Sequence, residues 1–264
     1  MPRLALFPFL GLMAAFAACK ACAQTGPHLA TATDVLFRDD FSREETGPAW
    51  KTNDAAKKAP GQSRIVDGAL VTKMAPHSDH GATVNTAVTF TDAVITFRFR
   101  LLDDRGFNRP VNDLTEKSVH AGHICRVKIA PGRVQLQDDK TGQMNLEVQK
   151  LRENPATAKE AAARLAGTTA SFNAPIEVGR WHALRVELVG DEMLVHVDGK
   201  IVGYHKSPGF AHTAKRSFGF TVTGATGVAF DDVILAKAIR SPNWAAESSG
   251  AIALLRPTEA KKRK

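Results

Sequence analysis

Cysteine is scarce in this sequence, with three residues among 264. Cys19 and Cys22 fall in the N-terminal segment that is treated below as a signal peptide, which leaves Cys125 alone in the rest of the chain. A single cysteine cannot close an intramolecular disulfide, so a disulfide-stapled fold is excluded. Cys125 lies in an apolar strand-like run, which is typical of a buried, unreactive thiol.

Tryptophan and tyrosine are also rare, with three and one residues. Carbohydrate-binding modules often stack sugars on exposed Trp or Tyr rings. Trp181 precedes an alternating run and is therefore expected to pack against the fold rather than to form a sugar platform. The composition disfavours a lectin site that depends on ring stacking.

Long apolar runs are absent outside the N-terminus. There, Arg3 precedes the apolar stretch from Leu4 to Ala18, and Ala21-Cys22-Ala23 offers small residues for cleavage before Gln24. The pattern predicts a signal peptide over residues 1–23, and hence export to the periplasm or beyond; the stretch is too short for a membrane-spanning helix. The alternatives are an N-terminal core helix and a lipoprotein acylated at Cys19.

The formal charge is +8. Removal of Arg3 and Lys20 with the signal peptide would leave about +6, part of it in the basic end Lys261 to Lys264. Export argues against nucleic acid as the partner. An anionic glycan or the cell surface is the better match for this charge.

Alternation of apolar and polar residues dominates the chain from residue 35 to residue 238. From Val94 to Leu101, bulky apolar residues share one phase and Thr96, Arg98 and Arg100 share the other. Similar runs recur, joined by turns such as Asp67-Gly68, Pro131-Gly132 and Asp198-Gly199. The pattern predicts one all-β domain, an antiparallel β-sandwich, over residues 35–238. Residues 24–34 are expected to be a disordered lead-in, and residues 239–264 an irregular basic tail.

One segment departs from the strand pattern. Asn154-Pro155 precedes a run from Ala156 to Ala166 that is rich in Ala, Lys, Glu and Arg, and Gly167 follows it. Asn is a good helix cap, Pro suits the first helical turn, and Gly suits the end. The sequence predicts one short helix inserted between strands.

Several short pieces, in this order, carry a resemblance to a known family. They are Phe37-Arg38-Asp39-Asp40-Phe41, Val66-Asp67-Gly68-Ala69-Leu70, Trp181-His182-Ala183-Leu184, Gly190-Asp191-Glu192-Met193, Val197-Asp198-Gly199-Lys200, Lys206 to His212, and Phe230-Asp231-Asp232-Val233. Together they resemble secreted bacterial proteins with a concanavalin A-like lectin/glucanase (laminin G-like) sandwich, and within that group the 3-keto-disaccharide hydrolase-like domain.

The resemblance implies a jelly-roll whose first and last strands pair, with ligands bound across the concave sheet. Laminarinase-like glycosidases of this fold carry Glu-x-Asp-x-x-Glu along one strand, and this sequence has no such spacing. Retaining hydrolysis by paired carboxylates therefore has no visible residues here.

Histidines give the first candidate site. His120 and His123 flank Gly122 at the start of a strand, and His77 and His80 form a second His-x-x-His pair. Neutral imidazole is both an acid–base group and a transition-metal ligand. We therefore expect His120 or His123 to act in catalysis, and His77 and His80 are metal candidates; scattered surface histidines are the alternative.

Acidic pairs give a second metal candidate. Asp39-Asp40 and Asp231-Asp232 would meet if the terminal strands pair, so Asp40 and Asp232 could hold a divalent ion such as calcium. The alternative is that these carboxylates only cap strand ends. The sequence does not establish a cofactor.

Basic and amide side chains share the polar phase of three runs. If the strands are neighbours, they form one patch that can grip sugar hydroxyls or a carboxylate; otherwise they are an ordinary solvated face. The members are Arg98, Arg100, Arg126, Lys128, Gln135 and Gln137. His212 and Lys215, in the loop that resembles a family signature, are further substrate-binding candidates, or serve only to shape a turn.

Two functions remain open from the sequence. One is an exported hydrolase of the 3-keto-disaccharide type, in which His120 or His123 supplies acid–base chemistry. The other is a non-catalytic glycan-binding or structural domain of the envelope. Carbohydrate is the expected partner in both, and a fold alone does not choose between them.

Overall fold

The structure is a computed structural model that describes residues 26–56, 61–255 and 257–258. The predicted signal peptide and the basic residues Lys261 to Lys264 lie outside these ranges. In the part of the chain that is described, no helix has the length and apolar character needed to cross a membrane.

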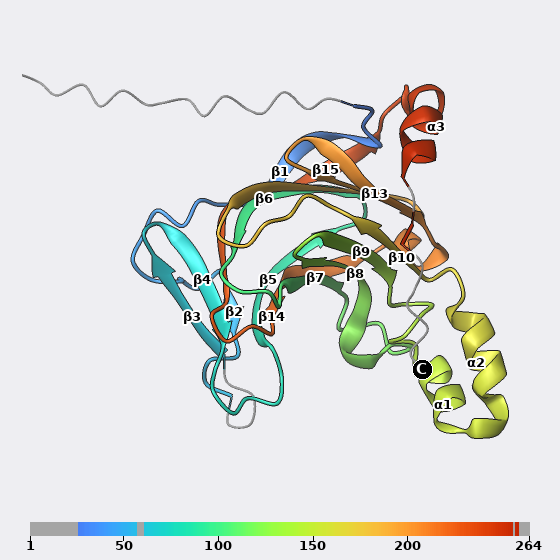
Figure 1. The fold of residues 1–264 in the computed structure, drawn as a ribbon, viewed down its shortest axis with the longest axis horizontal. Helices are drawn as coiled ribbons and strands as arrows, with labels where there is room; N and C mark the ends of the chain where they lie inside the picture. Colours follow the sequence, from blue (N-terminus) through green and yellow to red (C-terminus); the bar gives the residue numbers. More distant parts are fainter. Residues whose placement is uncertain (1–25, 57–60, 256, 259–264) are drawn as a thin grey trace, which may run out of the picture.

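Two antiparallel sheets lie face to face (Figure 1). Sheet A has the strand order β13-β12-β11-β6-β15-β4-β3, with β1 paired to β15. Its strands are β1 (Ala30–Asp39), β3 (Gly61–Val66), β4 (Ala69–Met74), β6 (Ala93–Leu101), β11 (Trp181–Val189), β12 (Glu192–Val197), β13 (Lys200–Lys206) and β15 (Val228–Arg240). Pairing of β1 with β15 confirms that the first and last strands are neighbours.

Sheet B has the order β10-β9-β8-β7-β14-β5-β2. Its strands are β2 (Lys51–Thr52), β5 (Ala82–Phe90), β7 (Phe107–Asn112), β8 (His123–Ala130), β9 (Arg133–Asp138), β10 (Thr169–Asn173) and β14 (Lys215–Val222). The predicted all-β antiparallel sandwich is confirmed.

The core between the sheets consists of the apolar phase of each strand. Phe220 of sheet B stacks on Phe230 of sheet A with ring centroids 3.9 Å apart, and Phe107 meets Phe230 edge-on at 5.0 Å. Cys125 is buried in this layer, and burial raises the pKa of its thiol to about 12. The prediction of an unreactive thiol agrees with this placement.

Arg109 is an exception within the core. Its position on β7 has the inward phase of Phe107 and Val111, and its side chain is fully buried. None of its three side-chain nitrogens has a hydrogen-bond partner among the described residues. Burial lowers the pKa of the guanidinium to about 10, so it remains charged at neutral pH.

The insertion after β9 contains more helix than the sequence predicted. α1 (Leu146–Glu153) and α2 (Ala158–Leu165) form a helical hairpin that projects from one end of the sandwich (Figure 1), joined by the 3₁₀ turn η2 (Pro155–Thr157). Asn145 caps α1, and Asn154 accepts a hydrogen bond from the Ala156 amide in η2. The prediction of a single helix is therefore corrected to two. The predicted run after Asn154 forms η2 and α2, and α1 is an additional helix that ends at Glu153, just before Asn154.

Both predicted irregular ends contain regular structure. β1 begins at Ala30, inside the expected lead-in, because it pairs with the far end of β15 at Arg240. The expected tail holds the end of β15 and the helix α3 (Trp244–Leu254). Trp244 of α3 packs with Leu29 and Leu194 on the outer side of sheet A, an interaction that local alternation does not reveal. Two further 3₁₀ turns are η1 (His120–Gly122) and η3 (Pro208–Ala211).

Candidate functional site

Polar side chains form rows across the outer face of sheet B. Asn112 of β7 pairs with His123 of β8, with a register shift beside them. Arg126 then pairs with Gln137, and Lys128 with Gln135, across β8 and β9. Directly opposite residues of an antiparallel pair point to the same side of the sheet. The predicted grouping of Arg126, Lys128, Gln135 and Gln137 is therefore what the sheet register produces.

Arg98 and Arg100 do not join this group, so that part of the predicted patch was wrong. Both lie on β6 of sheet A, on the other side of the core, because β6 pairs with β11 and β15. Their guanidinium groups lie over the Trp181 ring at 4.9 and 5.1 Å. Trp181 is half-buried on the outer side of sheet A, between these two arginines.

His123 is the best placed acid–base group on the outer face of sheet B. Its Nδ1 lies 2.7 Å from Asn112 Oδ1, an acceptor, so Nδ1 carries the proton and Nε2 keeps its lone pair. Burial, together with the smaller effects of the positive charges of Arg126 and His120, lowers the pKa of the imidazole to about 4. The ring is therefore neutral at physiological pH and can accept a proton.

The turn before β8 sets the position of both histidines. Gly122 adopts φ +71°, and a Cβ there would lie 2.4 Å from the Asp113 carbonyl oxygen. Only glycine fits this close approach of two backbones. His120 is exposed in η1, and its ring centroid lies 6.4 Å from that of His123. The structure thus brings the two predicted catalytic histidines together.

Arg126 is fixed beside His123 by a buried carboxylate. Its Nε donates to Asp139 Oδ2 at 2.5 Å, and Gln137 Nε2 donates to Asp139 Oδ1 at 2.6 Å. Burial raises the pKa of Asp139, although the charge and hydrogen bond of Arg126 oppose this. The pair orients Arg126 along the face instead of leaving it mobile.

Two buried polar atoms of this row have no partner among the residues that the structure describes. They are Arg126 Nη2, a donor, and Gln137 Oε1, an acceptor. Such atoms are rare in folded proteins, because each unmade hydrogen bond costs free energy. A donor beside an acceptor matches a sugar hydroxyl, which can accept from one and donate to the other.

A second polar cluster lies at the same end of sheet B. His212 Nε2 lies 2.9 Å from Asp113 Oδ2, and Lys140 Nζ lies 2.9 Å from His212 Nδ1. Burial alone would raise the pKa of Asp113, but hydrogen bonds from His212 and Thr115 hold it at about 2. Hydrogen bonds from Ser118 lower the pKa of Glu116 to about 2. His212 therefore anchors the β7–β8 loop within an ionic network.

Lys215 is not accessible to a ligand, contrary to the expectation. Its side chain is fully buried, and its Nζ donates to the carbonyl oxygens of Thr91 at 2.6 Å and His212 at 2.7 Å. It closes the end of the core by satisfying two backbone acceptors. The structural alternative, in which this loop shapes a turn, fits Lys215 better.

The predicted metal candidates are not assembled into one site. His77 and His80 lie in the exposed β4–β5 connection, at the end of sheet B opposite to the β7–β8 turn, and His80 pairs with Asp79 at 2.8 Å. Asp40 directly follows β1, and Asp232 lies in its partner strand β15, where it is 3.5 Å from Arg98. Neither set gains a third ligand within the described residues.

One unpredicted group does have metal-ligand composition. His28, Glu187 and His196 place ligand atoms within 4.8 Å of one another on the outer side of sheet A. Glu187 already binds His28 Nδ1 at 2.5 Å, Arg185 Nε at 2.6 Å and the Ala30 amide at 2.8 Å. These donors satisfy the carboxylate and fasten the N-terminal segment to β11, whereas both ring nitrogens of the buried His196 have no hydrogen-bond partner among the described residues.

Sequence reasoning missed Asn112 and Asp139. Asp139 continues the polar phase of Arg133, Gln135 and Gln137 beyond the end of β9, so extension of the alternation would have found it. Asn112 had no such signal, because its partnership with His123 depends on the register shift between β7 and β8.

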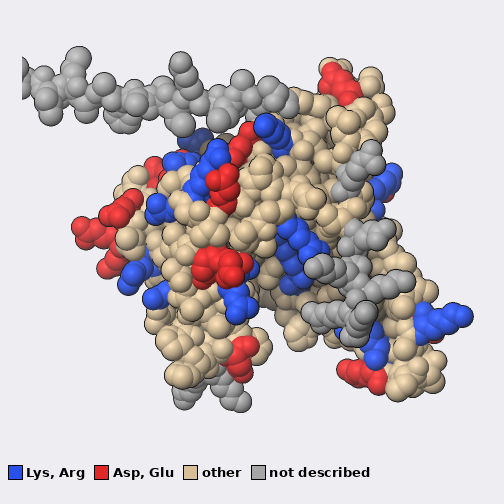
Figure 2. Space-filling model, in the orientation of Figure 1, with Lys and Arg blue, Asp and Glu red and all other residues tan. Residues whose placement is uncertain are grey.

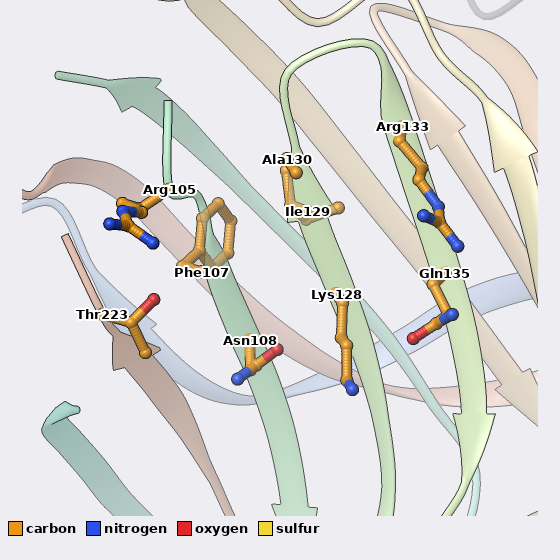
Figure 3. Close-up of a pocket in the computed structure, with 9 residues that line it drawn as sticks. All are labelled: Arg105, Phe107, Asn108, Lys128, Ile129, Ala130, Arg133, Gln135 and Thr223. Carbon is orange, nitrogen blue, oxygen red and sulfur yellow. The ribbon is translucent and has the colours of Figure 1, made fainter. Parts of the chain in front are cut away.

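The charged groups of the visible surface are dispersed. Figure 2 shows acidic and basic side chains interspersed over much of the visible face, so the described residues form no continuous basic surface on this face. A hollow at the other end of the β7–β9 face is an exception, because its lining gathers Arg105, Lys128 and Arg133 (Figure 3).

Comparison with known proteins gives a family and a fold. The 3-keto-alpha-glucoside-1,2-lyase-like domain matches residues 37–254. Among solved structures, a protein of unknown function with a galectin-like fold from Bacillus subtilis is 11% identical with a TM-score of 0.54, covering 80% of this chain and 100% of its own. The laminarinase from Rhodothermus marinus is 13% identical with a TM-score of 0.53, covering 81% and 100%. No curated protein matches the sequence.

Proposed function

We propose that this chain, which belongs to the family of 3-keto-alpha-glucoside-1,2-lyase-like domains, binds a 3-keto glycoside across the outer face of sheet B and cleaves it with His123 as the base. The observation that carries the proposal is the arrangement of His123, Arg126 and Gln137 in adjacent rows. A neutral imidazole lies there beside an unpartnered donor and an unpartnered acceptor.

The 3-ketone makes this chemistry accessible to a histidine. A carbonyl at C3 acidifies the hydrogen on C2, so removal of that proton gives an enolate. His123 Nε2 takes the C2 proton, and the electron pair forms the C1–C2 double bond while the C1–O bond to the leaving group breaks. The leaving oxygen takes a proton from His120, which gives an unsaturated 3-keto sugar and a free alcohol. Addition of water to C1 of the unsaturated sugar gives the hydrolysis product.

Each remaining group of the row has a role that its geometry supports. Arg126 Nη2 donates to the oxygen on C3, where negative charge develops, and Asp139 keeps the guanidinium in place. Gln137 Oε1 accepts from a ring hydroxyl. Asn112 fixes the tautomer of His123 that leaves Nε2 free.

This route does not need the paired carboxylates of the laminarinase type. Proton abstraction next to a ketone requires a base and a stabiliser of the enolate, and retaining hydrolysis instead requires two carboxyl groups about 5 Å apart. The lack of the Glu-x-Asp-x-x-Glu spacing is therefore compatible with an enzyme of a different mechanism.

Kinetics with His123→Ala test the proposal. We expect the wild-type protein to release the aglycone sugar from a 3-keto disaccharide, detected by mass spectrometry, and to leave the unoxidised disaccharide intact. Loss of a general base should lower kcat/KM by about 10²- to 10⁴-fold. The matched control is His80→Ala, which removes an exposed histidine of the β4–β5 connection and should retain wild-type activity.

Two results would count against this assignment. Activity of His123→Ala close to that of His80→Ala would remove His123 from the mechanism. If the wild-type protein binds the 3-keto disaccharide and forms no product, the chain is a glycan-binding domain and not an enzyme.

A further inference from the structure

A hollow of about 220 Å³ opens on the outer face of sheet B, toward the end of the rows opposite to His123 (Figure 3). β7, β8 and β9 supply most of its wall, and the segments after β6 and β14 close it. It is lined by Arg105, Phe107, Asn108, Lys128, Ile129, Ala130, Arg133, Gln135 and Thr223.

The lining carries positive charge without compensation. Its nine residues, all in the described part of the chain, include three cations, Arg105, Lys128 and Arg133, and no carboxylate. Among the carboxylates near these cations in sequence, Asp104 is exposed beside Arg105, and two others are committed elsewhere. Asp103 accepts from the amides of Arg105, Thr226 and Gly227, and Asp139 binds Arg126.

Lys128 is the central cation. Within residues 26–56, 61–255 and 257–258, its ammonium has neither an ion pair nor a hydrogen bond. Burial has the largest effect and lowers its pKa; the positive charges of Arg126 and, more weakly, Arg133 act in the same direction, and Asp139 opposes them. A half-buried lysine among like charges is stabilised by any anion that enters the hollow.

Neutral hydrogen-bonding groups surround the cations. Arg133 Nη2 and Gln135 Nε2 both donate to Ser171 Oγ, at 3.0 and 2.8 Å, which holds these two side chains along β9. Asn108 lies beside Lys128 in the next strand. The hollow therefore combines ordered cations with amides that can reach sugar hydroxyls.

We propose that this hollow is a subsite for an anionic group on the glycan ligand: a carboxylate, a sulfate ester or a phosphate ester. The inference rests on the proposed function, because it assigns the ligand to the same face of sheet B. It goes beyond that function in naming the substrate class, an acidic oligosaccharide.

The register places the anion away from the bond that is cleaved. Lys128 lies two polar rows along β8 from His123, and each row adds roughly 7 Å, so the separation is roughly 14 Å. The anionic group therefore belongs to a sugar ring next to the cleaved one, or to a substituent on it.

Calorimetric titration with charged and neutral sugars tests the subsite. The probes are glucuronic acid, glucose 6-sulfate and glucose 6-phosphate, compared with glucose. We expect at least one charged sugar to bind about ten-fold more tightly than glucose. This advantage should shrink in about 0.5 M NaCl, because the electrostatic screening length there is well below 10 Å. The three charged probes identify which anion is preferred.

Variants separate the hollow from general surface charge. Lys128→Met and Arg133→Gln should each reduce the selectivity for the charged sugar by about ten-fold. The matched control is Lys237→Met, at an exposed lysine of β15 that pairs with Asp34. This variant should retain the wild-type selectivity for the charged sugar. Equal affinity for glucose and all three charged sugars, or equal loss in Lys237→Met, would overturn the proposal.

Failure of the subsite is distinguishable from failure of the proposed function. Charged-sugar selectivity that depends on Lys128 supports the subsite even if no 3-keto substrate is cleaved. Cleavage that depends on His123, with no such selectivity, leaves the function standing and removes the subsite.

Discussion

At the residue scale, burial of charge distinguishes the functional groups from the structural ones. Arg126 is held by Asp139 and keeps a buried Nη2 without a hydrogen-bond partner among the described residues, whereas Lys215 donates to the backbone carbonyls of Thr91 and His212. Arg109 differs from both, because its buried guanidinium faces apolar core residues. No feature of the proposed site uses it.

Replacement of Arg109 by methionine is expected to stabilise the protein. The buried charge has no described hydrogen-bond partner, and a side chain of similar length without charge avoids the cost of desolvation. We predict that Arg109→Met raises the free energy of unfolding in urea by about 1 kcal/mol or more. Arg164→Met, at an exposed arginine of α2, should change it by less than about 0.5 kcal/mol. A clear loss of stability in Arg109→Met would show that the guanidinium has partners in solution.

At the element scale, the connection between β7 and β8 joins the fold to the site. The Asp113 amide donates to the Gly122 carbonyl at 2.8 Å, and the Asp113 carboxylate binds His212. Arg216 Nε lies 3.1 Å from the other Asp113 oxygen. This loop places His120 and His123, so its ionic anchors maintain the geometry of the site.

The loop should loosen at acid pH. Asp113 and Glu116 both have pKa values lowered to about 2, so their contribution to stability is complete above an unfolded-state pKa near 4. It is lost as the pH falls from about 4 through about 2, because protonation removes the ion pairs that only the folded state makes. We predict faster amide hydrogen exchange in residues 113–122 over this window, and a fall in the free energy of unfolding of order 1 kcal/mol from Asp113.

Asp113→Asn tests the assignment of this acid sensitivity. It should reduce the change between pH 5 and pH 2, whereas the exposed Asp34→Asn should retain the wild-type dependence. An unchanged pH dependence in Asp113→Asn would contradict the role given to this carboxylate.

The elements also show what local sequence determines. Alternation identifies a strand and the face of each residue, which is why Arg126, Lys128, Gln135 and Gln137 were grouped correctly across β8 and β9, joined by the Pro131-Gly132 turn. It does not identify neighbours that are distant in sequence. β6 has the same pattern as β8 but pairs with β11 and β15, so Arg98 and Arg100 were assigned to the wrong sheet.

The C-terminal helix α3 and the start of β1 were not predicted, for a related reason. α3 begins at Trp244, whose burial against Leu29 and Leu194 depends on segments far away in the chain. β1 likewise extends to Ala30 because the end of β15 is available to pair with it. Tertiary contacts of this kind override weak local preference.

At the scale of the whole molecule, the two outer faces of the sandwich have different tasks. The outer side of sheet A is partly covered by the N-terminal segment, fastened through His28 and Glu187, and by α3. The outer face of sheet B carries the rows from His123 to Lys128, including the unpartnered atoms of Arg126 and Gln137. Ligand binding is therefore assigned to the outer face of sheet B.

The most direct test of that assignment is a chemical-shift titration of the ¹⁵N-labelled His123→Ala variant with a 3-keto disaccharide, which this variant should bind without cleaving. We predict that the perturbed amides lie in β7, β8, β9 and β10, centred on Arg126 and Gln137. Perturbations centred instead on Trp181 and the β6–β11 face of sheet A, or no perturbation at all, would contradict the account.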